Sequence, residues 1–280
     1  MNSIGIMLGR LSHPVDNQIQ NFPMDTWQKE FLLAEKIGFE VIEWVFDLNP
    51  NPIMNKNQLS EIKEISKKHT ISINSVCADY FMSKKLVDVS QYDLEKNIET
   101  LKQLIENCNY LGIKWLEIPL VDSSSLKNRN SQQKLVENLN PVLDYAEKNN
   151  VFLTFETDLE PLTFKNFLIN FEHKNIKANY DVGNSTSLGY DVKNELEILS
   201  PWISNIHVKD RLIGGSTIPL GSGDVDFEQF FSALSTINYQ GDLIIQGARE
   251  DLENTSITPE STCKKYLKFV EQYIHKYLKN

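Results

Sequence analysis

Four polar side chains stand near the ends of the last four apolar segments of this sequence, and their types are those that bind divalent metal ions. They offer two carboxylates, one imidazole and one amide oxygen, a set dominated by oxygen donors. Such a set suits Mn2+, Mg2+ or Co2+, and Zn2+ accepts the same groups. The four residues are Glu156, Asp181, His207 and Gln246.

The elements that must position these residues follow a regular alternation. Eight short segments rich in Ile, Val, Leu or aromatic residues alternate with longer segments of helical periodicity. Alternating β and α units predict a parallel sheet, and eight of them in 280 residues match the size of a (β/α)8, or TIM, barrel. We therefore expect a single domain over residues 1–280. The predicted strands cover 3–8, 41–46, 71–77, 114–121, 151–157, 176–182, 203–208 and 242–247.

Local signals mark several helix boundaries. Gly38 is expected to end the first helix, Pro141 to kink or break the fourth, and Asp226 to begin the seventh.

A doubly wound open sheet is the rival architecture, but it normally carries a glycine-rich phosphate loop after its first strand. The sequence Gly-Ile-Met-Leu-Gly-Arg at 5–10 lacks that pattern, which favours the barrel.

In such a barrel, functional groups lie where each strand ends, and neighbouring strands are about 4.8 Å apart. Taken alone, Asp181 in Tyr-Asp-Val-Gly-Asn is typical of a turn or a helix cap. Four such residues at equivalent positions on successive strands favour a shared metal ion instead.

Composition excludes several classes of protein. The net charge of −10 argues against a mainly electrostatic nucleic-acid binder, which needs a basic face. Three cysteines without a C-x-x-C pair are typical of reduced thiols, and no segment has the ~20 apolar residues needed to span a bilayer. We expect a soluble, cytoplasmic protein with no membrane partner.

Three arginines near the predicted strand ends could bind an anionic group. A guanidinium binds phosphate or carboxylate through two parallel hydrogen bonds. Arg10 follows the first strand, Arg211 lies four residues past His207, and Arg249 lies three past Gln246. Their positions favour a phosphorylated or acidic substrate.

Four further polar residues are candidates for the site, and three of them, Lys209, Glu43 and Asp79, are candidates for substrate binding. Lys209 shares the strand face of His207 because side chains alternate along a strand. Glu43 lies within the second strand, where a buried carboxylate needs a partner, and Glu117 is a similar case. Asp79 follows the third strand.

The chain resembles the sugar isomerase/epimerase superfamily of xylose-isomerase-like TIM barrels. The likeness is strongest to the L-ribulose-/L-xylulose-5-phosphate 3-epimerases and the hexulose-6-phosphate isomerase-like proteins. It covers essentially the whole chain and is most specific in Asp-Val-Gly-Asn, His-Val-Lys-Asp and Gly-Ser-Gly-Asp-Val-Asp-Phe between 179 and 246. The resemblance implies that Glu156, Asp181 and His207 are metal ligands and that the substrate is a sugar or sugar phosphate. Relatives are often dimers or tetramers, so self-association stays open.

One residue departs from the family pattern. The epimerases have a second glutamate where this chain has Gln246, and they use two carboxylates to remove and return a proton beside the carbonyl. An amide can bind a metal through its oxygen, but it cannot act as a base. An aldose–ketose isomerase needs only one base, for which Glu156 suffices; an epimerase would need another group, such as Asp79, Glu43 or Lys209.

Other functions stay open at this point. Related barrels include a dehydratase, so a lyase is an alternative, and Gln246 also fits a catalytically altered barrel that only binds a sugar. Apurinic endonucleases share the barrel, but they use many more histidines than this chain places at strand ends. We favour a divalent-metal-dependent isomerase or epimerase.

Overall fold

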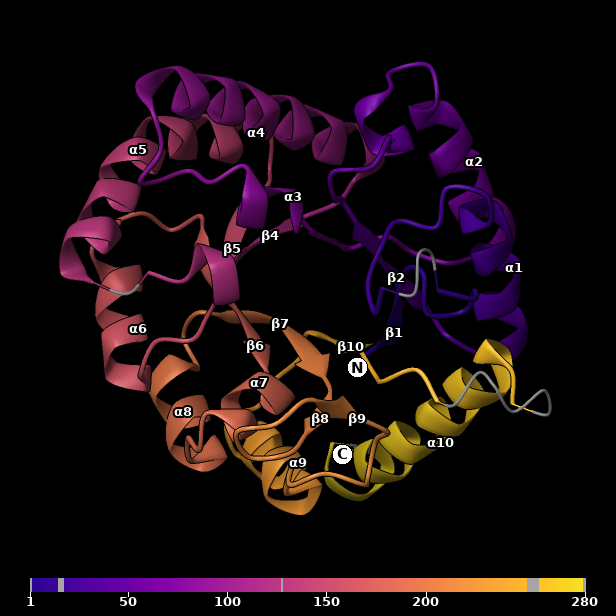
Figure 1. The fold of residues 1–280 in the computed structure, drawn as a ribbon. Helices are drawn as coiled ribbons and strands as arrows, with labels where there is room; N and C mark the ends of the chain where they lie inside the picture. The colour runs from indigo at the N-terminus through magenta and orange to yellow at the C-terminus, as the bar shows by residue number, and fades with distance from the viewer. Residues whose placement is uncertain (1, 15–17, 127, 251–256, 279–280) are drawn as a thin grey trace.

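The computed structural model describes residues 2–14, 18–126, 128–250 and 257–278. Within them, eight parallel strands close into a barrel in the order β1-β2-β3-β4-β5-β6-β7-β10, and β10 pairs with β1. Figure 1 looks along this barrel and shows the helices as a ring around it. The predicted (β/α)8 barrel is therefore confirmed. The strands are β1 Ile4–Met7, β2 Val41–Val45, β3 Ser75–Cys77, β4 Trp115–Leu120, β5 Phe152–Thr157, β6 Ile176–Asp181, β7 Ile203–Val208 and β10 Asp242–Ile245.

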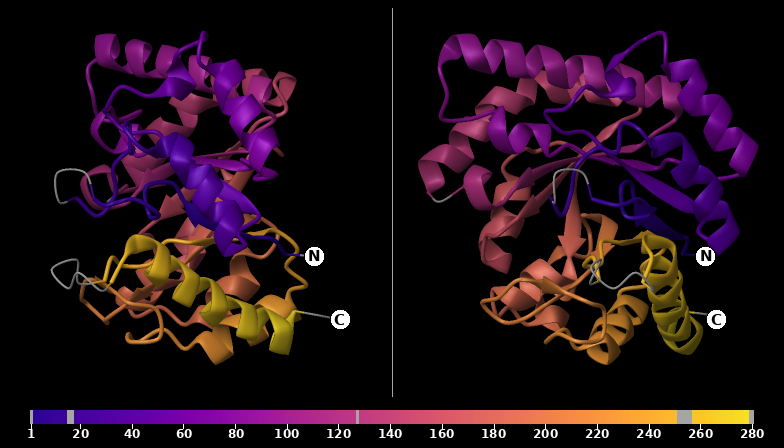
Figure 2. Two further views of the ribbon diagram at one scale, coloured as in Figure 1. Left: turned by 90° about the vertical axis from the view of Figure 1, so that its right-hand side faces the viewer. Right: turned by 45° about the vertical axis from the view of Figure 1, so that its right-hand side comes forward.

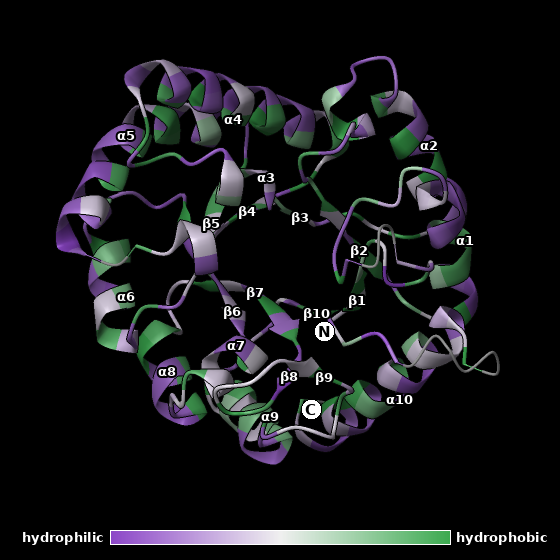
Figure 3. Cartoon of the chain, viewed as in Figure 1, coloured by the Kyte–Doolittle hydropathy of each residue, from purple (hydrophilic) through white to green (hydrophobic). Residues whose placement is uncertain are grey.

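Eight longer helices form the outer layer, and the side views of Figure 2 show them packed along the outside of the strands. These helices carry both apolar and polar residues, which appear as green and purple segments along the same helices in Figure 3. None of the helices in the described ranges is both long and apolar enough to cross a membrane. The helices are α1 Trp27–Ile37, α2 Leu59–His69, α4 Gln91–Leu111, α5 Arg129–Lys148, α6 Pro161–Ile169, α8 Val192–Leu199, α9 Phe227–Thr236 and α10 Pro259–Tyr277.

Two of the three predicted helix signals are confirmed, and of the two outcomes expected at Pro141 the break does not occur. Gly38 adopts a left-handed conformation (φ 109°) and ends α1, and Asp226 accepts a hydrogen bond from the Gln229 N–H at the start of α9. Pro141 does not break its helix, because α5 continues through it to Lys148. The missing N–H and the ring of a proline weaken one turn, but Leu139, Val142 and Leu143 are buried beside it and hold the helix on the barrel.

Several short elements surround the carboxyl-terminal ends of the strands and were not expected from the sequence. The connection between β7 and α9 contains an antiparallel pair of two-residue strands, β8 Asp210–Arg211 and β9 Thr217–Ile218. The Asp210 carboxylate accepts hydrogen bonds from the backbone N–H groups of Gly221 and Gly223, at 2.8 and 2.9 Å. The other short elements are η1 Pro52–Met54, α3 Tyr80–Ser83, η2 Asp122–Ser124 and α7 Val182–Ser187.

Phe155 shows how the outer layer fixes a strand that carries functional residues. Its side chain is fully buried on β5, with its ring centroid 5.5 Å from that of Phe167 and 5.4 Å from that of Phe171. Because side chains alternate along a strand, Phe155 faces the helices while its neighbours Thr154 and Glu156 face the barrel interior. The aromatic cluster thereby holds β5 at a fixed depth and rotation.

We expect Phe155→Ala to lower the free energy of unfolding by about 3–5 kcal/mol, because it removes a buried ring and leaves a cavity. Urea unfolding followed by circular dichroism measures the change. Leu162→Ala, on a 53 % exposed side chain of α6, is the control and should change stability by less than about 0.5 kcal/mol. Equal effects of the two substitutions would contradict this role for Phe155.

Candidate metal and substrate site

The strand register brings the predicted metal ligands to one end of the barrel. Asp181 on β6 is the direct lateral neighbour of His207 on β7, and His207 is in turn the neighbour of Ile244 on β10. Gln246 lies two residues beyond Ile244 and so shares its inward face. Glu156 reaches the same level from β5, and all four ligand candidates are buried. The expected convergence is thus a consequence of parallel closure.

Three of the four groups lie within contact distance. His207 Nδ1 is 3.4 Å from Glu156 Oε2 and 3.8 Å from Asp181 Oδ2, and the ligand atoms of all three residues lie within 4.8 Å of one another. Gln246 joins them through Lys209, whose Nζ is 2.9 Å from Gln246 Oε1 and 3.3 Å from Asp181 Oδ2. The Lys209 ammonium therefore links the amide to the carboxylate–imidazole trio.

A second group of carboxylates lies on the other side of the His207 ring. Glu43 Oε2 is 2.7 Å from His207 Nε2, and Glu117 Oε2 is 3.3 Å from the same nitrogen. Asn205 donates to Glu43 Oε1 at 2.9 Å, which fixes that carboxylate. Neither oxygen of Glu117 makes a hydrogen bond within the described residues, although the residue is only 1 % exposed.

These contacts shift the pKa values of the cluster. Burial opposes the charged imidazole, but the carboxylates of Glu117 and Glu43 outweigh it and raise the pKa of His207 well above its ordinary value. Burial also acts to raise the pKa of Glu156, yet its contacts with His207 and the charge of Lys209 lower it to about 2. Burial raises the pKa of Glu117 well above its usual range. In the protein without a metal, a protonated His207 thus balances part of the carboxylate charge.

A polar cleft of about 810 Å3 opens above this cluster. It is lined by Glu156, Glu117, Gln246 and Lys209 from the strand ends, and by residues of the loops above them. Of the other predicted substrate-binding residues, Arg10, Asp79 and Arg211 also line the cleft. Glu43 is fully buried beneath it and contacts His207, so it lies behind the proposed ligand rather than at the cleft surface.

The three arginines have different surroundings. Arg211 Nη1 donates to Asn184 Oδ1 at 2.8 Å, and its other nitrogens bind the Gly215 carbonyl within the β8–β9 hairpin. Arg10 donates to the Ile19 carbonyl and to Gln20 Oε1, which fixes the loop after β1 against the cleft.

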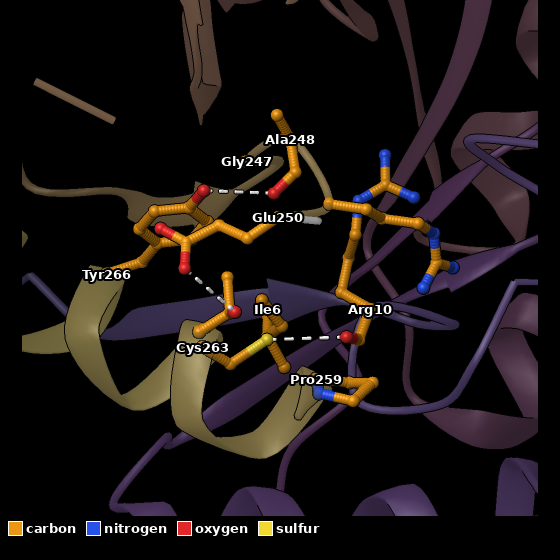
Figure 4. A pocket seen from close by; sticks show the side chains of 10 residues that line it. Ile6, Arg10, Gly247, Ala248, Glu250, Pro259, Cys263 and Tyr266 are labelled. Carbon is orange, nitrogen blue, oxygen red and sulfur yellow. Dashed lines mark hydrogen bonds between the residues drawn. The ribbon is translucent and has the colours of Figure 1, made fainter. Parts of the chain in front are cut away.

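Arg249 is not among the residues that line the cleft. It binds the carbonyls of Gly9 and Ser12 at 2.6 and 2.7 Å and borders a small cavity of about 10 Å3 between the end of β10 and α10. Figure 4 shows this cavity with Arg10, Cys263 and Tyr266 on its sides. The space is too small for a sugar, and Arg249 instead holds the first loop in place.

Four amide residues complete the site and were not identified as site residues from the sequence. Asn179 and Asn205 lie two positions before Asp181 and His207 and share their inward faces; Asn179 Nδ2 is 3.1 Å from His207 Nδ1. Asn184 contacts Glu156, and Gln20 reaches Gln246 from the first loop. Strand alternation signals the first two, whereas no local pattern marks Gln20.

The fold and this site together define a (β/α)8 barrel with carboxylates and a histidine at the carboxyl ends of its strands. Residues 31–271 match the family model described as xylose isomerase-like TIM barrel. The chain belongs to this family, as the resemblance implied.

The relatives and structural neighbours include several named sugar epimerases. The chain is 23 % identical to the L-ribulose-5-phosphate 3-epimerase UlaE of Shigella flexneri, over 85 % of this chain and 88 % of that protein. It is 25 % identical to the putative L-ribulose-5-phosphate 3-epimerase SgbU of Haemophilus influenzae, over 79 % and 83 %. Among solved structures, an L-ribulose 3-epimerase superposes with a TM-score of 0.78 at 17 % identity, covering 99 % of this chain and 96 % of that one. A structure of the IOLI protein with bound zinc gives 0.78 at 18 % identity, covering 98 % and 99 %.

Glu195 supports the element that presents Asp181. From α8 it accepts a hydrogen bond from the Tyr180 hydroxyl at 3.0 Å and one from Ser185 Oγ at 3.1 Å, and it is 4 % exposed. It thereby joins β6 to α7 directly behind Asp181. Burial raises the pKa of Glu195 to about 7.

We expect Glu195→Gln to remove a pH-dependent loss of stability. Because the folded-state pKa is raised, the folded protein holds this proton more tightly than the unfolded chain, so stability falls as pH rises from about 4.5 through about 7. The full effect is roughly 3 kcal/mol. Thermal unfolding at pH 5 and pH 8 should show the variant gaining stability relative to wild type at the higher pH. Glu197→Gln, on an exposed side chain of the same helix, is the control; an equal pH response of both variants would argue against this role.

Proposed function

We propose that the protein is a divalent-metal-dependent isomerase or epimerase that moves a proton next to the carbonyl of a sugar or sugar phosphate. The observation that carries the proposal is the convergence of Glu156, Asp181 and His207 in the barrel interior, where Glu156 also lines the polar cleft. The names of the relatives, which are sugar and sugar-phosphate epimerases, support the same class of substrate. A single domain over 1–280, a cytoplasmic location and self-association stay predictions.

The residues present fit a metal ion. Both carboxylate oxygens of Glu117 are buried without hydrogen bonds to the described residues, and carboxylates lie on both sides of the His207 ring. This excess of acidic groups in the barrel interior favours the binding of an additional cation. Glu156, Asp181, His207 Nδ1 and Gln246 Oε1 would hold the ion, while His207 Nε2 donates its proton to Glu43. Mn2+, Mg2+, Co2+ and Zn2+ all accept this donor set. Such an ion, when bound, polarises a carbonyl and stabilises negative charge on its oxygen.

Glu156 is the proposed catalytic base. Its lowered pKa keeps it ionised at neutral pH, so it can accept a proton, and Asn184 Nδ2 donates to its Oε1 and orients it. Arg10, Lys209 and Arg211 bring positive charge to the cleft of an otherwise acidic protein. This local charge favours an anionic group on the substrate and hence a sugar phosphate.

Gln246 supports two rival functions. Because its amide cannot exchange a proton and its oxygen is bound by Lys209, the site also fits a barrel that binds a sugar without turning it over, or a lyase that uses Glu156 alone. The first of these rivals differs from the proposed enzyme in a measurable way, since it removes no proton from its ligand.

Incubation with a panel of pentulose and hexulose phosphates in D2O tests the proposal. Deuterium at C3 with an inverted product identifies an epimerase, and deuterium at C1 or C2 with an aldose product identifies an isomerase. Glu156→Gln should slow exchange at least about 100-fold, because it removes the base. Glu137→Gln, on the exposed face of α5, is the control. If no member of the panel acquires deuterium, the proposal is wrong.

Metal binding has its own test, which needs no substrate. We expect Glu43→Gln to weaken Mn2+ binding about 10–100-fold in calorimetric titration of the metal-free protein, because Glu43 orients His207. Glu40→Gln, an exposed change just before β2, should bind as wild type does. Wild-type affinity in Glu43→Gln would exclude the orienting role, and a wild-type protein that binds no divalent ion would contradict the metal dependence.

A further inference from the structure

A chain of three hydrogen bonds crosses the cleft at the level of Gln246. Lys209 Nζ donates to Gln246 Oε1 at 2.9 Å, and Gln246 Nε2 donates to Gln20 Oε1 at 3.1 Å. Gln20 Nε2 then donates to Asp79 Oδ2 at 2.5 Å. The chain connects the end of β7 to the residues after β3 by way of the first loop.

These three hydrogen bonds all run in one direction, from Lys209 to Asp79. This direction explains why an amide, and not a carboxylate, is found at position 246. Each carboxamide accepts through its oxygen and donates through its nitrogen, so both orientations are determined by the Lys209 ammonium at one end and the Asp79 carboxylate at the other. A glutamate at 246 would have no proton to donate to Gln20 Oε1. Arg10 Nη2 also donates to that oxygen, at 3.2 Å, and reinforces the orientation of Gln20.

The surroundings of Asp79 suit a residue that transfers protons to or from a substrate. It lines the cleft, it is half-buried, and its second oxygen lies 3.4 Å from the Cys77 thiol, which donates to it. One carboxamide, that of Gln20, bridges it to Gln246. Burial raises the pKa of Asp79 to about 6 although both hydrogen bonds act to lower it, so its acid and base forms are both accessible near neutral pH.

We propose that Asp79 is the second proton-transfer residue of the site and takes the part that a carboxylate at 246 would otherwise play. The inference rests on the proposed function in its epimerase form. Glu156 removes the proton from the carbon beside the carbonyl and becomes a carboxylic acid. The Asp79 carboxylic acid then gives its proton to the other face of the same carbon and becomes a carboxylate. Both groups return to their starting states by proton exchange with water, and no oxidant or other reactant is needed.

Asp79→Asn separates the two proton transfers. With a substrate that wild type epimerises in D2O, we expect inverted product to fall at least about 100-fold. Deuterium exchange into recovered substrate should stay within about tenfold of wild type, because Glu156 can still remove and return the proton on one face. Adding Gln246→Glu to Asp79→Asn should restore inversion, since it returns a carboxylate to the mouth of the cleft.

Two further variants complete the test. Asp144→Asn makes the same change on an 81 % exposed side chain of α5 and should leave both rates unchanged. Gln20→Met keeps Asp79 but removes the amide that orients it, and should slow inversion about tenfold while exchange continues. If Asp79→Asn does not fold, Gln20→Met still tests the role of Asp79.

The outcomes separate this inference from the proposed function. Inversion at the wild-type rate in Asp79→Asn overturns the role of Asp79, and so does a parallel loss of exchange and inversion, which would indicate a binding or structural role. A wild-type protein that forms only an aldose overturns this inference and leaves the proposed function intact. A wild-type protein that exchanges no proton overturns both.

Discussion

The structure depends above all on balancing negative charge that is buried inside the barrel. Glu43 and Glu117 lie on one side of the His207 ring, and Glu156 and Asp181 lie on the other. Carboxylates removed from water are costly unless a cation or hydrogen-bond donors compensate them. His207 is therefore the electrostatic centre of the interior, and the orientation of each neighbouring amide follows from which carboxylate it must satisfy.

The same requirement links the fold to the site through single residues. Asp181 Oδ1 accepts from the Asn184 N–H and begins α7, while its Oδ2 faces His207 and Lys209. One carboxylate thus caps a helix with one oxygen and directs the other toward the imidazole and the ammonium of the site. Gly183 in the same turn lies against Lys209, where an added Cβ would meet the lysine backbone and side chain at 2.9–3.0 Å. The Asp-Val-Gly-Asn sequence is explained by this close approach as much as by the chemistry of Asp181.

The sequence was sufficient for those features that local periodicity or strand alternation determines. Eight apolar segments predicted the barrel, and the positions of Asp181 and His207 near the ends of successive strands predicted that they lie together. It was insufficient where contacts join distant segments. Gln20 meets Asp79 across 59 positions and Gln246 across 226, and no local pattern records either pairing. The depth of Glu43 and the turn of Arg249 toward the first loop likewise depend on tertiary packing.

Gln246 can now be understood from its neighbours rather than as the loss of a glutamate. A carboxylate there would place a fifth acidic group beside Glu43, Glu117, Glu156 and Asp181, and its charge would repel the lone pairs of Gln20 Oε1. The amide keeps an oxygen toward Lys209 and supplies a proton toward Gln20, so it lowers the charge that His207 must balance. The change at 246 and the amide at 20 therefore form a matched pair, and a proton-transfer carboxylate on the other side of Gln20 is compatible with both.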